Sequence, residues 1–175
     1  MINFISTLLS YLTLAGQLLI AVLLLLYFFD RENNFLQFVS KNAVFFAFVV
    51  ALGATLGSLF MSEIVGYEPC KLCWYQRILL YPQVILLGLA LWKKEKIVAA
   101  RNSIALSAVG AGVAIYHYLV QLGVAPEPAC DVVGLTVSCS QRFVMSFGYI
   151  TIPLMSLTAF ALILVLLKLR PISKP

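Results

Sequence analysis

The four cysteines of this 175-residue chain fall into two pairs whose spacing suits disulfide exchange. Cys70 and Cys73 form a Cys-x-x-Cys motif, and Cys130 and Cys139 are separated by eight residues. A two-residue gap lets a pair close into a small, readily exchanged disulfide. We expect a helix to begin near Cys73, where the first amide N–H groups and the helix dipole favour a negative sulfur. The thiolate is the form of cysteine that attacks disulfides.

Two other uses of four cysteines compete with exchange chemistry. Inert disulfides would staple the loops, but a staple has no need of a Cys-x-x-Cys motif at a helix start. Zinc would suit the first pair, whereas the spacing of Cys130 and Cys139 does not match that of the usual zinc ribbon. We therefore expect no metal site and interpret all four cysteines as catalytic.

The elements that must position these cysteines are strongly apolar. Hydrophobic residues make up 62% of the chain and charged residues 11%, too few charges for the surface of a soluble domain. Only helices and closed barrels span lipid, and the apolar runs are too long for barrel strands. We predict an all-α membrane protein with spans at roughly 5–29, 42–62, 74–92, 102–121 and 147–167.

The first apolar run is expected to be a retained span and not a secretory signal. It opens without a basic residue, exceeds the length of a signal core and is not followed by an Ala-x-Ala site. It holds no cysteine, so we expect it to pack or anchor at the edge of a four-helix transmembrane bundle formed by spans two to five. The predicted division is 1–41 for this extra helix with its cytoplasmic connection, and 42–175 for the bundle. In span two, the spacing of Gly53 and Gly57 favours close approach of another helix.

The charge distribution predicts how the chain crosses the membrane. The net charge is +5, and most of the twelve basic residues lie between spans one and two, between spans three and four, and after span five. By the positive-inside rule these regions are cytoplasmic, so the N-terminus is outside and the C-terminus is inside. Both cysteine loops then lie on the extracytoplasmic side of a cytoplasmic (inner) membrane, where disulfides persist. We attribute the basic charge to this topology and not to nucleic-acid binding.

Two ionisable residues lie just below the predicted outer surface. Arg77 follows Cys73 by four residues on the same helix face, and His117 is the single histidine, near the outer end of span four. Each is about four residues deep, or ~6 Å along a helix. Polar groups at that depth usually face protein, water or a ligand, so the pair is a candidate site for the carbonyl oxygens of a quinone. The alternatives are an Arg77 that snorkels to lipid phosphates and a His117 that is a satisfied interfacial residue.

Three segments of the sequence resemble the DsbB family of membrane thiol:quinone oxidoreductases, and especially its BdbC branch. They are 68–78 (EPCKLCWYQRI) with the Tyr-Pro that follows at 81–82, then 116–121 (YHYLVQ), and 148–154 (GYITIPL). The resemblance covers roughly 42–167, so the first span is an addition to the family pattern. Vitamin K epoxide reductases place the loop cysteines before the Cys-x-x-Cys motif, which is the reverse of the order here.

This resemblance implies roles for the cysteines. Cys70 and Cys73 would be the quinone-side pair, and Cys130 and Cys139 the pair that oxidises an extracytoplasmic thioredoxin-like (DsbA-like) partner. The enzyme would reoxidise that partner, pass the electrons to ubiquinone or menaquinone, and so support protein disulfide bond formation.

The same resemblance matches Arg77 with the family's arginine associated with quinone binding, and His117 with the histidine of the corresponding span. From the residues alone, a non-catalytic membrane scaffold with disulfide-stapled outer loops stays open as an alternative. A small transporter ranks last, because no predicted span contains a buried acidic residue. Membrane lipid is the other expected partner of these apolar helices.

Overall fold

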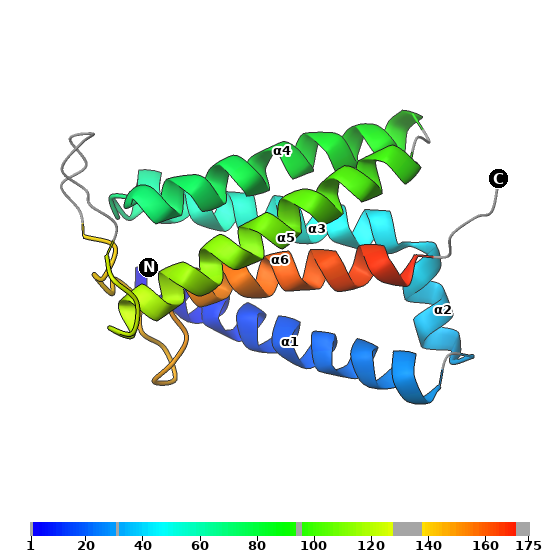
Figure 1. Cartoon of the computed structure of the whole chain (residues 1–175), viewed down its shortest axis with the longest axis horizontal. Helices are drawn as coiled ribbons and strands as arrows, with labels where there is room; N and C mark the ends of the chain where they lie inside the picture. The colour runs from blue at the N-terminus through cyan, green and yellow to red at the C-terminus, as the bar shows by residue number, and fades with distance from the viewer. Residues whose placement is uncertain (1, 31, 94–95, 128–137, 171–175) are drawn as a thin grey trace.

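The chain is described by a computed structural model that covers residues 2–30, 32–93, 96–127 and 138–170 (Figure 1). Its helices are α1 (Ile2–Phe29), α2 (Asn34–Lys41), α3 (Ala43–Leu59), α4 (Lys71–Lys93), α5 (Lys96–Gln121) and α6 (Ile152–Leu169). A short π-helix, η1 (Phe60–Ile64), continues α3. Within the described ranges the only β-type pairing is an isolated bridge between Ser146 and Ile150. The predicted all-α fold is therefore confirmed.

Four of the five predicted spans are helices long and apolar enough to cross a membrane. Among the described residues these are Ile5–Phe29, Ala43–Ile64, Ile97–Gln121 and Ile152–Leu169. The span predicted at 74–92 lies in α4, whose 23 residues measure about 35 Å at the helical rise. Polar residues, including Gln76, Arg77 and Gln83, make α4 less apolar than the other four, so its crossing stays a prediction. The chain is a multi-pass membrane protein.

The helices run up and down so that both described cysteine loops meet at one end of the bundle. Figure 1 shows the N-terminus, the start of α4 and the end of α5 at one end, and α2, the end of α4 and the end of α6 at the other. Short connections make successive long helices antiparallel neighbours. This arrangement brings Cys70, before α4, close to Cys139, which lies between α5 and α6.

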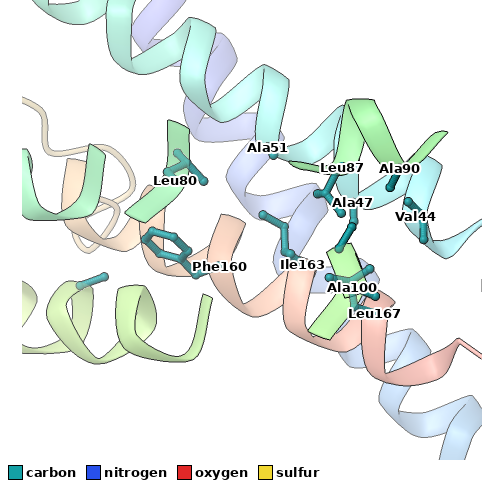
Figure 2. Close-up of a cluster of buried hydrophobic side chains, with 12 residues drawn as sticks. Val44, Ala47, Ala51, Leu80, Leu87, Ala90, Ala100, Phe160, Ile163 and Leu167 are labelled. Carbon is teal, nitrogen blue, oxygen red and sulfur yellow. The ribbon is translucent and has the colours of Figure 1, made fainter. Parts of the chain in front are cut away.

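The middle of the bundle is an apolar core drawn from α3, α4, α5 and α6 (Figure 2). Phe160 of α6 is fully buried there, close to Leu80 and Ile163. Gly110 of α5 makes room for the Phe160 ring, because a Cβ at this glycine would lie 2.5 Å from ring carbons. The core therefore depends on one helix presenting a bare surface where its neighbour presents a large ring.

The short helix α2 lies in a stretch that the sequence analysis treated as part of a cytoplasmic connection. Its start is capped by Asn33, whose side-chain oxygen accepts a hydrogen bond of 2.9 Å from the amide of Phe35. On one face Leu36 and Val39 are buried in a cluster with Leu23 of α1 and two leucines of α6. Because α2 packs in this way, it connects α1 and α6 at the end of the bundle away from the cysteines.

The two glycines of span two have different surroundings. A Cβ at Gly57 would lie 3.2 Å from a methyl group of Leu9, so a side chain of α1 packs against α3 at this point. A Cβ at Gly53 would have no neighbour within 4 Å. Gly57 therefore makes room for a side chain of α1, whereas Gly53 borders a cavity.

Candidate functional site

The first cysteine pair lies at the start of α4. Cys70 immediately precedes the helix and Cys73 lies in its first turn, where the amide of Trp74 donates to the carbonyl of Cys70 at 3.1 Å. The two Sγ atoms are 3.5 Å apart, and the Cys70 thiol donates a hydrogen bond to the sulfur of Cys73. That bond, together with burial, raises the pKa of Cys70 to about 12. Cys73 is thus the sulfur that receives a hydrogen bond and lies at the helix start, as the sequence predicts.

His117 of α5 is buried beside this pair and links it to the second loop. Its Nε2 atom is 3.6 Å from the Sγ atom of Cys70 and 3.2 Å from the backbone oxygen of Cys139. A carbonyl oxygen can only accept, so the ring proton belongs on Nε2. The Nδ1 atom then accepts from the side-chain amide of Gln76, 2.9 Å away. Gln76 itself contacts the hydroxyl of Ser156 in α6, so three helices hold the imidazole in place.

Cys139 is held in a tight turn whose polar groups converge on Glu127. The carboxylate of Glu127 accepts from the Cys139 amide, from the Ser138 hydroxyl at 2.6 Å and from the Ser140 hydroxyl at 3.3 Å. These bonds, that of Ser138 first, hold the pKa of Glu127 below its ordinary value. Burial raises the pKa of Cys139 to about 11. Cys130 lies outside the described residues.

The sulfur atoms of the two loops come close together. The Sγ atom of Cys139, that of Cys70 and a ring nitrogen of His117 all lie within 4.8 Å of one another. Three such groups are also a possible ligand set for a metal ion. In this structure, however, the Nε2 proton is engaged by the Cys139 carbonyl. The grouping therefore agrees better with thiol chemistry than with ligation by His117.

Arg77 faces α3 and not His117. Its Nε atom donates to the hydroxyl of Ser58 and its terminal nitrogen to the Ser58 carbonyl, both at 3.1 Å. The hydroxyl of Tyr81 also donates to that of Ser58, at 3.2 Å. The guanidinium lies 5.4 Å from the centroid of the Trp74 ring. Arg77 and His117, which the sequence places at the same depth in the membrane, thus have separate hydrogen-bond partners. Both nevertheless border the same cavity.

That cavity has a volume of about 530 Å³ and extends from the cysteines into the bundle. Its polar end includes Cys70, Cys73, Arg77 and His117. Most of its other lining residues are apolar and come from α1, α3 and α6, and they include Leu162. An apolar cleft with a few polar groups at one end is the usual form of a small-molecule site.

Comparisons with known proteins show which family the chain belongs to. A family model described as "Disulfide bond formation protein DsbB" matches residues 40–169, most of the chain. This chain belongs to the DsbB family. It is 43% identical over 134 residues to "Disulfide bond formation protein C" of Bacillus subtilis (strain 168), covering 74% of this chain and 94% of that protein.

Other relatives give the same picture. The identity is 42% over 125 residues to "Probable disulfide formation protein C 1" of Bacillus anthracis, covering 71% of this chain and 88% of the relative. It is 34% over 126 residues to a "Probable disulfide formation protein" of Metapseudomonas resinovorans, covering 72% and 87%. No solved structure gives a significant match. The suspected relationship to DsbB and BdbC is therefore confirmed, and with it a role of the chain in disulfide formation as a thiol oxidoreductase.

The DsbB match begins at residue 40 and so leaves out α1. The structure nevertheless packs α1 against α6 and places it along the cavity. The expectation of a helix at the bundle edge was therefore incomplete, because one face of α1 borders the candidate site.

Sequence reasoning missed three residues that shape this DsbB-family site. Gln76 orients His117, Ser58 holds Arg77, and Glu127 organises the turn around Cys139. The sequence did offer a reason to consider Gln76, because it immediately precedes Arg77 in the segment that resembles the family. Ser58 and Glu127 carry no such signal, since their partners are 19 and 12 residues away along the chain.

Proposed function

We propose that this protein is a membrane thiol:quinone oxidoreductase that reoxidises an extracytoplasmic thioredoxin-like partner. The observation that carries the proposal is the continuous arrangement of Cys139, Cys70 and Cys73, which ends at an apolar cavity. Exchange between the loops needs the first two sulfur atoms close together, and electron transfer to a lipid-soluble acceptor needs the third at a site open to apolar molecules.

The first step concerns the second cysteine pair. A thiolate of the partner attacks the Cys130–Cys139 disulfide at Cys130, forms a mixed disulfide and releases Cys139 as a thiolate. Cys139 then attacks Cys70 of the Cys70–Cys73 disulfide, so a Cys70–Cys139 bond forms and Cys73 leaves. The separation of less than 4.8 Å between the sulfur atoms of Cys139 and Cys70 supports this direction of attack.

Cys73 is suited to be the leaving sulfur. It lies in the first turn of α4, where free amide groups stabilise negative charge, and the Cys70 thiol donates to it in the reduced pair. A sulfur that accommodates negative charge leaves faster in disulfide exchange. Cys73 also borders the cavity. Electrons that arrive at Cys73 are therefore next to the space where an acceptor can bind.

His117 is proposed to position the two loops and to handle protons. Its Nε2 proton is shared between the Cys139 carbonyl and the Cys70 sulfur, so a negative charge on Cys70 would be stabilised. Gln76 keeps the ring in the tautomer that donates from Nε2. His117 thus acts mainly on the cysteines. Its link to the acceptor is that it also borders the cavity.

The residues around the cavity fit a quinone. Arg77 supplies a cation held by Ser58 at the polar end, and the aliphatic walls suit an isoprenoid tail. A quinone supplies a two-electron, two-proton acceptor dissolved in the bilayer. The partner's second thiol attacks its mixed disulfide and releases Cys130, and Cys130 then attacks Cys139, which frees Cys70 and leaves the Cys70–Cys73 dithiol to be reoxidised. Overall, one dithiol of the partner becomes a disulfide while one quinone becomes a hydroquinone. Ubiquinone and menaquinone share this chemistry.

The distribution of basic residues supports the same proposal. Lys41, Lys93 and Lys168 lie in the last turns of α2, α4 and α6, and Arg101 lies near the start of α5. Figure 1 shows these helix ends at the end of the bundle away from the start of α4. If this end is cytoplasmic, both cysteine loops are extracytoplasmic and accessible to a secreted partner. A membrane-impermeant thiol reagent should then label the reduced cysteines of intact cells from outside.

The test is quinone reduction by the purified full-length protein supplied with a reduced thioredoxin-like partner. Wild-type protein should oxidise one partner dithiol for each quinone reduced. Cys73→Ser should abolish quinone reduction, whereas the partner should still form a mixed disulfide with the variant through Cys130. Wild-type protein with no quinone reduction in the presence of reduced partner would contradict the proposal and favour a scaffold with stapled loops.

A further inference from the structure

The helix α1 lies outside the family match, yet it forms one wall of the cavity. Its lining residues recur along one face and are Leu9, Leu12, Thr13, Ala15, Gly16 and Leu19. From Leu9 to Leu19 this wall is about 15 Å long at 1.5 Å per residue. Further lining residues come from α3 and η1, between Val49 and Met61, and α6 packs against both α1 and α3. The elongated part of the cavity is therefore bounded by α1.

Specific contacts fix the rotation of α1 about its axis. The hydroxyl of Tyr149 donates to the Oε1 atom of Gln17 at 3.2 Å, and the Gln17 amide donates to the hydroxyl of Thr158 at 3.4 Å. Near the outer end, the ring of Tyr11 packs edge-on against Phe147 with centroids 5.4 Å apart. Hydrogen bonds between apolar helices hold a defined packing. The lining face of α1 is thus distinct from the face left to lipid.

Small residues leave space in the middle of the cavity. A Cβ at Gly53 of α3 would have no neighbour within 4 Å, so this glycine faces open volume. On α1, Ala15 and Gly16 border the same cavity, and a Cβ at Gly16 would lie 3.1 Å from a methyl group of Thr158. Small residues on α1 and α3 therefore line the same part of the cavity.

We infer that α1 is the tail-binding wall of the acceptor site, so that the isoprenoid tail of the quinone lies between α1 and α3. This inference rests on the proposed function, because it names where that acceptor binds. The polar end of the cavity holds the thiols and Arg77, which leaves the aliphatic end for the tail. Leu12 is then a specificity-determining residue for tail length, although it is far from the cysteines along the chain.

The α1 helix itself offers a matched pair of variants. Leu12 is 59% exposed and lines the cavity, whereas Leu18 is 64% exposed and is not among its lining residues. Leu12→Trp adds bulk to the cavity, and Leu18→Trp adds the same bulk on another face of the same helix. A general effect of a large side chain on α1 would appear in both variants.

The experiment uses full-length protein in lipid nanodiscs and two quinones with the same ring, one with a long isoprenoid tail and one without. Leu12→Trp should raise KM for the tailed quinone about tenfold or more, as expected for misfit in an apolar pocket. Its KM for the tailless quinone should change less than about twofold, and Leu18→Trp should leave both values near those of wild type. Equal changes in the two variants would overturn the inference.

A direct readout is photolabelling with a quinone that carries a photoreactive group in its tail. The labelled peptides of wild-type protein should include α1, and excess unlabelled tailed quinone should suppress the labelling. Labelling confined to other helices would overturn the inference while quinone reduction still supported the proposed function. Labelling of α1 in a protein that reduces no quinone would support binding of the tail at α1 and contradict the proposed quinone reduction.

Discussion

The middle of the bundle and the end that holds the cysteines are both buried, but they are stabilised in different ways. Around Phe160 the neighbours are apolar, and the fit depends on the bare surface of Gly110. Around His117 the buried groups include polar side chains, and hydrogen bonds join the imidazole to Gln76 and Gln76 to Ser156. Burial of a polar group is unfavourable without a partner, so this network stabilises the buried imidazole. Changes in the middle should therefore affect stability, and changes at the cysteine end should affect the reaction.

The largest effect is expected for Cys139→Ser, which removes the sulfur that links the two loops. Cys130 is then a free thiol that a reduced partner cannot attack, and no thiolate is left to attack Cys70, so turnover should be lost. The Cys130 thiolate can still attack the disulfide of the oxidised partner, so with that form a mixed disulfide through Cys130 should be trapped, seen by non-reducing electrophoresis and mass spectrometry. A trapped species that runs through Cys70 would show that the two pairs have been assigned in the wrong order.

Arg77→Ala should have the next largest effect, because it removes the cation at the polar end of the cavity. Loss of one charge-assisted hydrogen bond is worth about 1.5–3 kcal/mol, or roughly ten- to a hundredfold in apparent quinone affinity. A single round of partner oxidation by Cys130–Cys139 should continue at its normal rate. Steady-state quinone reduction at varied quinone concentration measures the effect. Unchanged kinetics would reduce Arg77 to an anchor at the membrane surface.

In the middle of the bundle, Gly110→Ala should reduce stability without altering the chemistry. The added Cβ would lie 2.5 Å from the Phe160 ring, and overpacking of this kind costs about 1–3 kcal/mol. The matched control is Gly112→Ala on the same helix, where a Cβ would have no neighbour within 4 Å. Thermal unfolding should separate the two variants, and quinone KM should not. A similar melting temperature for both would contradict the tight fit around Phe160.

The smallest effect concerns pH. Because burial raises the pKa of Cys139 to about 11, its thiol should stay protonated at pH values where an ordinary thiol, with a pKa near ~8.5, has already ionised. Alkylation of Cys139 in the reduced protein should therefore keep increasing between about pH 9 and 11. Mass spectrometry of alkylated peptides gives the profile, with a small free thiol as the reference. A plateau below pH 9 would mean that Cys139 is not in this buried environment.

The sequence predicts the helices and the position of the Cys-x-x-Cys motif at a helix start well, because both depend on local features. Long apolar runs give the spans, and a Cys-x-x-Cys motif before α4 puts Cys73 in its first turn. The short helix α2 was missed because its eight residues are fewer than the 11–18 residues over which helical periodicity is counted. It is stabilised mainly by contacts of Leu36 and Val39 with distant helices.

The rotation of each helix could not be predicted in the same way. Helices such as α1 and α3 are apolar on all sides, so their sequences do not indicate which face meets protein and which meets lipid. For this reason Arg77 and His117, equal in predicted depth, were expected to act together, whereas the structure directs Arg77 to Ser58 and His117 to the cysteines. For the same reason, the sequence could not indicate that one face of α1 lines the cavity.

The central claim is that Cys139 passes electrons to Cys70, and a pair of retained cysteines tests it most directly. In the double variant Cys73→Ser/Cys130→Ser, only Cys70 and Cys139 remain, and their sulfur atoms lie within 4.8 Å of each other. Mild oxidation should convert this variant almost completely to a protein with an intramolecular Cys70–Cys139 disulfide, identified by mass spectrometry of non-reduced peptides. Two thiols that stay free, or that react only between molecules, would contradict the account.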